Sequence, residues 1–116
     1  MNELVEQLTA KVGLERAVAE KTIGIILGFL RKEGPADQVQ ALIDKIPGSQ
    51  AAIDAYGSGG MLSGLMALGG KLMGLGLGMN EIKAVARELF KFGRDKVGAD
   101  QMGEIIAGTP GLSQFA

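Results

Sequence analysis

The sequence contains no His, no Cys and no Trp, and only 4% of its residues are aromatic. Without His there is no histidine general acid–base catalysis, and without Cys there is no thiolate chemistry, disulfide or Cys/His zinc or haem site. An excess of one charge is also missing, because 12 Lys and Arg oppose 13 Asp and Glu for a net charge of −1. We therefore expect no cofactor and no overall field that attracts nucleic acid.

The 116 residues are 47% hydrophobic, which is enough apolar material for the core of one globular domain. The start of the chain does not have the pattern of a signal peptide, because Glu3, Glu6 and Lys11 interrupt its apolar positions and no basic region precedes them. We expect a cytoplasmic location, unless a leader has been removed.

Two parts of the chain resemble each other, one starting at Gly13 and the other at Gly76. Ten of the 36 pairs that follow from this alignment are identical, including the run Ala-Asp-Gln at 36–38 and 99–101. We interpret the chain as a single domain, 1–116, with an internal duplication: copy one spans about 13–56, a Gly/Met-rich segment spans 57–79, and copy two spans about 76–116.

Each copy carries the period of α-helices. Apolar residues recur at i, i+4, i+7 and i+8 from Ala19 and again from Ile82. Each pattern breaks near Gly34 or Gly98, and a shorter helix follows. We expect Pro35 at the first position of such a helix and Ser49 as the N-cap of a further one.

No segment alternates with period two, so the predicted fold is all-α, a small helical bundle built from two duplicated helical units. The predicted core comprises Ile23, Ile26, Leu27, Leu30, Val39, Leu42, Ile43 and Ile46 in copy one, and Ile82, Leu89, Phe90, Met102, Ile105 and Ile106 in copy two.

The residues 22–30 are apolar nearly all round the helix, with Gly24 and Gly28 at positions that copy two fills with Arg87 and Lys91. Such a helix is buried on every side. We expect it to be the central helix of the domain. The alternative is that its glycine face meets a second subunit at close range.

The Gly/Met-rich segment 57–79 holds nine of the 19 glycines and four of the six methionines. Three interpretations compete: a transmembrane helix, a flexible linker, or two short helices in the core, roughly 60–68 and 71–75, with Gly69-Gly70 as a hinge. The charge of Lys71 opposes the first, and the many Leu and Met residues oppose the second. We favour the third interpretation and do not expect a membrane span.

Several polar motifs have simple structural explanations. The run Gly74–Gly78 lacks the Gly-Lys-Ser/Thr ending of a phosphate loop. The carboxylates lack the spacing of a calcium loop, so we predict no metal site and no catalytic residues. Arg31 and Arg94 are expected to pair with Asp37 or Asp100, or with helix-terminal carbonyls. The cations between 83 and 96 alternate with acidic residues, which is typical of a solvated helix face.

The Gly-Leu helix entry, the run Ala36-Asp37-Gln38 and the stop Ile46-Pro47-Gly48 resemble a bacterial family of unknown function, the VcgC/VcgE-like proteins. The Gly/Leu/Met middle is also similar. The first copy is similar to a second uncharacterised family of duplicated helical units. The resemblance implies an all-α fold and brings no activity, cofactor or site residues.

These observations favour a non-enzymatic helical binding or protein-interaction module that self-associates or binds another protein or an apolar ligand. The alternative is a small-molecule carrier or enzyme with carboxylate, Lys or Arg groups in a pocket between the two copies. The expected apolar contact surface consists of Gly24, Gly28, Met61, Leu65, Met66 and Met73.

Overall fold

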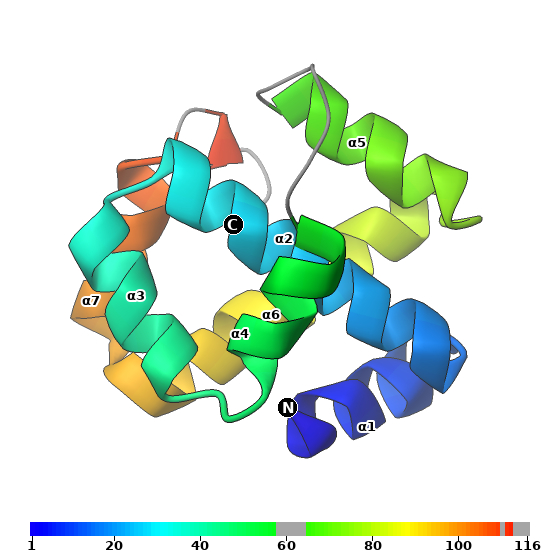
Figure 1. Cartoon of the computed structure of the whole chain (residues 1–116), viewed down its shortest axis with the longest axis horizontal. Helices are drawn as coiled ribbons and strands as arrows, with labels where there is room; N and C mark the ends of the chain where they lie inside the picture. Colours follow the sequence, from blue (N-terminus) through cyan, green and yellow to red (C-terminus); the bar gives the residue numbers. More distant parts are fainter. Residues whose placement is uncertain (58–64, 110, 113–116) are drawn as a thin grey trace.

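A computed structural model describes residues 1–57, 65–109 and 111–112, and these form helices without strands (Figure 1). The predicted all-α fold is therefore confirmed. In chain order the elements are α1 (Asn2–Lys11), α2 (Arg16–Glu33), α3 (Ala36–Asp44), α4 (Ser49–Ala52), the π-helix η1 (Ile53–Gly57), α5 (Leu65–Gly74), α6 (Met79–Val97) and α7 (Ala99–Ala107).

Helix α2 is the centre of the fold. It packs against α1, α3, α4, η1 and α5, and residues 22–30 are all buried. Figure 1 shows α2 crossing the middle of the molecule, with α3 and α7 on one side and α5 on the other. The prediction of a central helix is therefore correct, and the apolar character on all sides follows from having neighbours on all sides.

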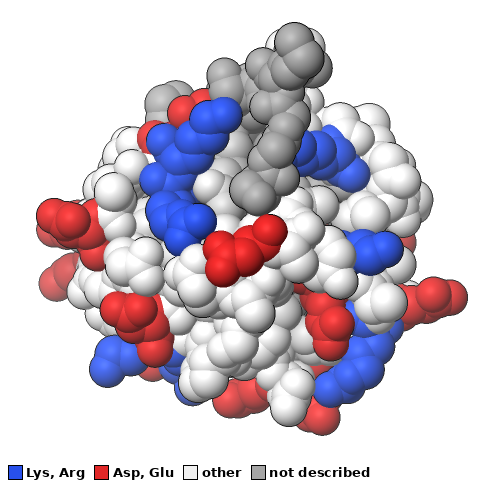
Figure 2. Space-filling view, in the orientation of Figure 1, with Lys and Arg blue, Asp and Glu red and all other residues white. Residues whose placement is uncertain are grey.

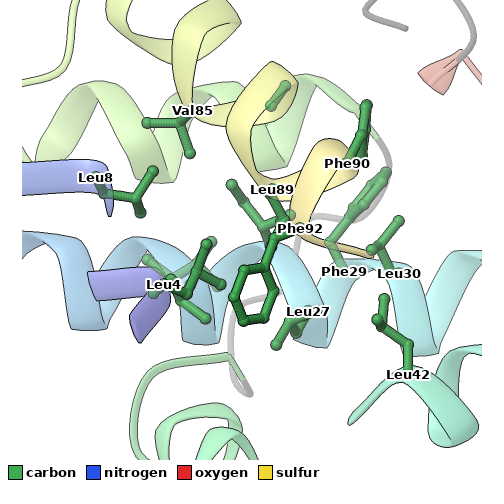
Figure 3. Packing of buried hydrophobic residues seen from close by; sticks show 14 of the residues in the cluster. Leu4, Leu8, Leu27, Phe29, Leu30, Leu42, Val85, Leu89, Phe90 and Phe92 are labelled. Atoms are coloured by element: carbon green, nitrogen blue, oxygen red, sulfur yellow. The ribbon is translucent and has the colours of Figure 1, made fainter. Parts of the chain in front are cut away.

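The predicted core residues of both copies are all buried. Figure 3 shows where they meet: Leu27 and Leu30 of α2 lie below Leu89, Phe90 and Phe92 of α6, with Leu42 of α3 beneath Leu30 and the side chains of α1 to the left. Phe90 and Leu89 of α6 are each only 1% exposed. Helix α1, which lies outside both predicted copies, adds Leu4, Val5 and Leu8 to the same cluster.

The two predicted copies share most of their helix bounds. Helix α2 begins at Arg16 and α6 at Met79, which are equivalent positions of the two copies, and α3 and α7 begin and end at equivalent positions as well. Glycines with positive φ also recur in equivalent places, at Gly13 and Gly76 and again at Gly48 and Gly111. This agreement is what a duplication predicts, and a common origin of the two copies stays a prediction.

Two predicted helix starts differ in detail. Pro35 precedes α3 with an extended backbone and is the N-cap, so the first helical residue is Ala36. Ser49 is not an N-cap, because Gly48 holds that position with φ +91° and Ser49 is already helical. The buried Ser49 hydroxyl lies 3.0 Å from the carbonyl oxygen of Ile43 and 2.6 Å from that of Ile46. It therefore donates to carbonyls at the end of α3 rather than accepting from the start of α4.

In the part of the chain that the structure describes, no helix combines the length and apolar character that crossing a membrane requires.

Candidate functional site

Gly24 and Gly28 of α2 pack against the backbone of other segments of the same chain. A Cβ atom on Gly24 would overlap the Ala52 carbonyl oxygen and lie 2.8 Å from the Ala52 carbonyl carbon. A Cβ atom on Gly28 would lie 2.7 Å from the carbonyl oxygen of Gly57. The two glycines therefore allow a close approach of the α2 backbone to the backbones of α4 and η1.

This packing corrects the prediction that Gly24 and Gly28 belong to an apolar contact surface for a partner. Both residues are buried, and the space beside them is filled by Ala52 and Gly57. At the corresponding positions of α6, Arg87 and Lys91 are exposed. The glycines of α2 therefore serve internal helix packing, which needs a close approach of two backbones.

Helix α5 contains most of the described part of the Gly/Met-rich segment. It runs without interruption from Leu65 to Gly74, so the predicted hinge at Gly69-Gly70 is wrong. Met61 lies outside the described residues, as does the side chain of Leu65. Glycine tolerates the helical conformation, and here the helix continues through both residues at a cost of about 1 kcal/mol each relative to Ala.

A groove of about 440 Å³ lies between α5 and α6, with α2 beneath it. The floor is formed by buried side chains, among which Leu72 and Phe90 are each 1% exposed. Every described lining residue is apolar or glycine: Ile26, Met66, Leu68, Gly69, Gly70, Leu72, Met73, Met79, Ile82, Ala86, Phe90 and Leu112. This volume lies within the range of about 300–1,000 Å³ that is common for ligand pockets.

Three methionines project from the edges of this groove. Met66 is 93% exposed, and Met73 and Met79 are each 52% exposed. In the described residues, the other large hydrophobic side chain with comparable exposure is Tyr56. Exposed apolar side chains that gather in one place indicate an interaction site, whereas scattered ones do not. Met66 and Met73 of the predicted contact surface therefore belong to the groove.

The described lining of this groove has no charged side chain. The alternative prediction of an enzyme or carrier requires carboxylate, Lys or Arg groups, and the described lining has none of them. Asp37 and Asp100 are exposed in the first turns of α3 and α7, as expected from the helix dipole. Within the described ranges, no three His, Cys, Asp or Glu residues gather in a way that would hold a metal ion.

The remaining polar motifs bind the helices together. Arg31 donates to the side-chain oxygen of Gln50 at 3.2 Å and so joins α2 to α4, whereas an aspartate or a helix-terminal carbonyl was the predicted partner. The Gln38 amide donates to the Glu104 carboxylate and joins α3 to α7. The run Gly74–Gly78 comprises the last residue of α5 and the turn to α6, in which the backbone N–H of Gly78 donates to Glu81 at 2.9 Å.

Sequence reasoning did not anticipate the α6 side of the groove. Ile82 and Phe90 are predicted core residues, and they are buried, but Ile82, Ala86 and Phe90 also line the groove. One sequence feature could have indicated that α6 takes part in the groove: Met79, the last methionine of the Gly/Met-rich segment, is also the first residue of α6.

Charged side chains of both signs alternate over the face shown in Figure 2, without a large area of one sign. Comparison of the chain with models of protein families, with curated proteins and with solved structures finds no match. The resemblance to the VcgC/VcgE-like proteins stays a prediction.

Proposed function

We propose that this chain is a non-enzymatic interaction module that receives an apolar segment of a protein partner in the groove between α5 and α6. The observation that carries the proposal is the gathering of Met66, Met73 and Met79 around an open groove whose described lining is apolar. Methionine side chains are flexible and polarisable, so they adapt to the shape of a partner.

A helical segment is a suitable occupant for an apolar groove between two helices. A helix laid into an apolar groove contributes side chains at i, i+3, i+4 and i+7. The molecule measures 31 × 31 × 26 Å. A helix of about 18 residues is about 27 Å long and therefore matches the width of one face.

Catalysis is not part of the proposal. General acid–base or nucleophilic catalysis needs a titratable or nucleophilic group within hydrogen-bonding reach of the substrate. The described residues of the groove provide an apolar surface, which binds apolar groups of a partner and excludes water. The cytoplasmic location predicted from the start of the sequence remains part of the proposal.

The experiment is fluorescence polarisation with a labelled helical peptide of this length that has Leu at i, i+3, i+4 and i+7 and Gln at its other positions. The double variant Met66→Glu, Met73→Glu places two charges beside the groove and should weaken binding at least tenfold. The matched control, Ala17→Glu with Tyr56→Glu, places the same charges at exposed positions outside the described lining and should leave binding unchanged. Absence of binding, or equal loss in both variants, would contradict the proposal.

A small-molecule carrier is the second candidate, because the groove volume of about 440 Å³ would also hold an apolar ligand. Native mass spectrometry of freshly purified protein distinguishes the candidates. A retained apolar molecule that is lost in the double Met variant would favour the carrier. The same spectra report the number of subunits and so test self-association.

A further inference from the structure

We propose that the partner helix received by the α5–α6 groove is acidic along one flank. This inference rests on the proposed function and adds the charge of the partner to it. Its basis is a row of exposed cations on α6, which consists of Lys83, Arg87 and Lys91 and is called the basic row below.

The basic row lies directly beside the groove. Each of its members immediately follows a groove residue in the sequence, since Lys83 follows Ile82, Arg87 follows Ala86 and Lys91 follows Phe90. One residue corresponds to a rotation of about 100° around a helix. The three cations are therefore one step around α6 from the three apolar side chains, and at intervals of four residues they run parallel to the groove.

The basic row is not explained by pairing within α6. Lys83 and Arg87 have no acidic residue three or four positions away, and they are themselves like-charged neighbours at i, i+4. Such a pair destabilises a helix by about 0.2–0.5 kcal/mol. Across the described part of the chain, neither residue forms an ion pair within 4.0 Å. Within α6, acidic residues at the spacing that the predicted solvated face requires are present only for Lys91, which has Glu88 and Asp95 three and four positions away.

Neither Glu81 nor Glu88 of α6 stands between the basic row and the groove. Glu88 follows Arg87 and is a further step of about 100° around the helix. Glu81 accepts the hydrogen bond from Gly78 at the start of α6. An approaching helix consequently meets positive charge along the α6 edge, where acidic side chains of the partner would pair with it and set its orientation.

The α5 edge provides room for a backbone. Cβ atoms built on Gly69, Gly70 and Gly74 would meet no atom within 4 Å, and none of these residues has a positive φ. Neither packing nor backbone conformation within the described structure therefore requires glycine there. Small residues four positions apart allow two helices to approach closely, and Gly70 and Gly74 have this spacing on an exposed face.

A second copy of the chain fits this surface less well. Two subunits that meet through the same surface patch bring the same residues to one interface. The basic row of each copy would then enter that interface with like charge, which disfavours association. The acidic helix α1 of one copy does not offer an apolar face to the groove of another, because its apolar residues Leu4, Val5 and Leu8 are completely buried.

The test compares two labelled peptides by fluorescence polarisation at low salt. Both share the length and the Leu positions of the peptide described above; one has Glu along a single flank and the other has Gln there. We expect the Glu peptide to bind at least tenfold more tightly, and 0.5 M NaCl to remove this advantage because it screens the charges. The variant Arg87→Glu, Lys91→Glu should lose the advantage and retain the affinity for the Gln peptide.

The matched control is Lys11→Glu, Lys45→Glu, which changes the net charge equally at exposed positions at the ends of α1 and α3. It should keep the preference for the Glu peptide.

Equal binding of the two peptides would overturn the acidic partner and leave the proposed function intact. Failure of both peptides to bind would overturn the acidic partner and the proposed function together. A dimer of the unliganded protein that Arg87→Glu, Lys91→Glu strengthens would overturn the acidic partner and assign the groove to a second copy. Binding to phosphatidylserine vesicles without a preference for the Glu peptide would overturn it in favour of a membrane surface.

Discussion

The substitution Gly24→Ala is expected to destabilise the protein, although alanine is the better helix former. The added Cβ atom would overlap the Ala52 carbonyl oxygen and lie 3.3 Å from the Ala52 Cβ atom. The obstructing atoms belong mainly to a backbone and cannot rotate away. Relief of the overlap requires α4 and η1 to move away from the centre of α2, against which both are packed.

The expected magnitude follows from two opposing effects. Replacing Gly by Ala in a helix interior favours folding by about 1 kcal/mol. Forcing extra atoms into a packed interior costs about 1–3 kcal/mol. Because the contact involves backbone, we expect the second effect to dominate, with a net loss of up to about 2 kcal/mol in the free energy of unfolding.

The matched control is Gly103→Ala in the middle of α7. A Cβ atom there meets nothing within 4 Å and the backbone φ is not positive, so this substitution should stabilise the protein by about 0.5–1 kcal/mol. Urea unfolding followed by circular dichroism at 222 nm measures both values. If Gly24→Ala stabilises the protein as much as Gly103→Ala does, then the close packing of α2 on α4 is refuted.

Three further predictions concern other parts of the fold. Leu89→Ala should cost about 2–5 kcal/mol in urea unfolding because it empties a core position, whereas Met66→Ala should change stability by less than about 0.5 kcal/mol because that side chain is 93% exposed; equal effects would refute this assignment of core and surface. Ser49→Ala should cost about 1–2 kcal/mol because it removes the hydroxyl that donates to carbonyls at the end of α3, and an unchanged melting temperature would show that water replaces it. Amide hydrogen exchange should be faster in α5 than in residues 22–30, since α5 contains glycines without packing neighbours; equal protection would contradict the weak helix inferred there.

Much of the core could be predicted because helical periodicity is a local property. All the residues that were predicted to be in the core because they recur on one helix face are buried. The central place of α2 was also predictable, since a helix that is apolar on all sides must be covered on all sides. Ser49 shows where local reasoning failed. The N-cap pattern considers only the helix that follows the serine, whereas the Ser49 hydroxyl donates to a carbonyl of the preceding helix α3.

The groove was only half predictable. Methionine enrichment identified Met66 and Met73, but the opposite wall consists of Ile82, Ala86 and Phe90, which have the same periodicity as any core-facing helix. A sequence pattern distinguishes the covered face of a helix from its solvated face. It does not show whether the neighbouring helix covers that face completely or leaves an open space beside it.

Glycine spacing illustrates the same division. The four-residue intervals at Gly24/Gly28 and at Gly70/Gly74 are equivalent in the sequence, and local periodicity predicted the helix around the first pair but wrongly placed a hinge at Gly69-Gly70 beside the second. In the folded chain the first pair is in contact with the backbone of α4 and η1, and the second pair faces open space. The difference arises from which helices become neighbours, and that depends on the simultaneous packing of segments far apart in the chain.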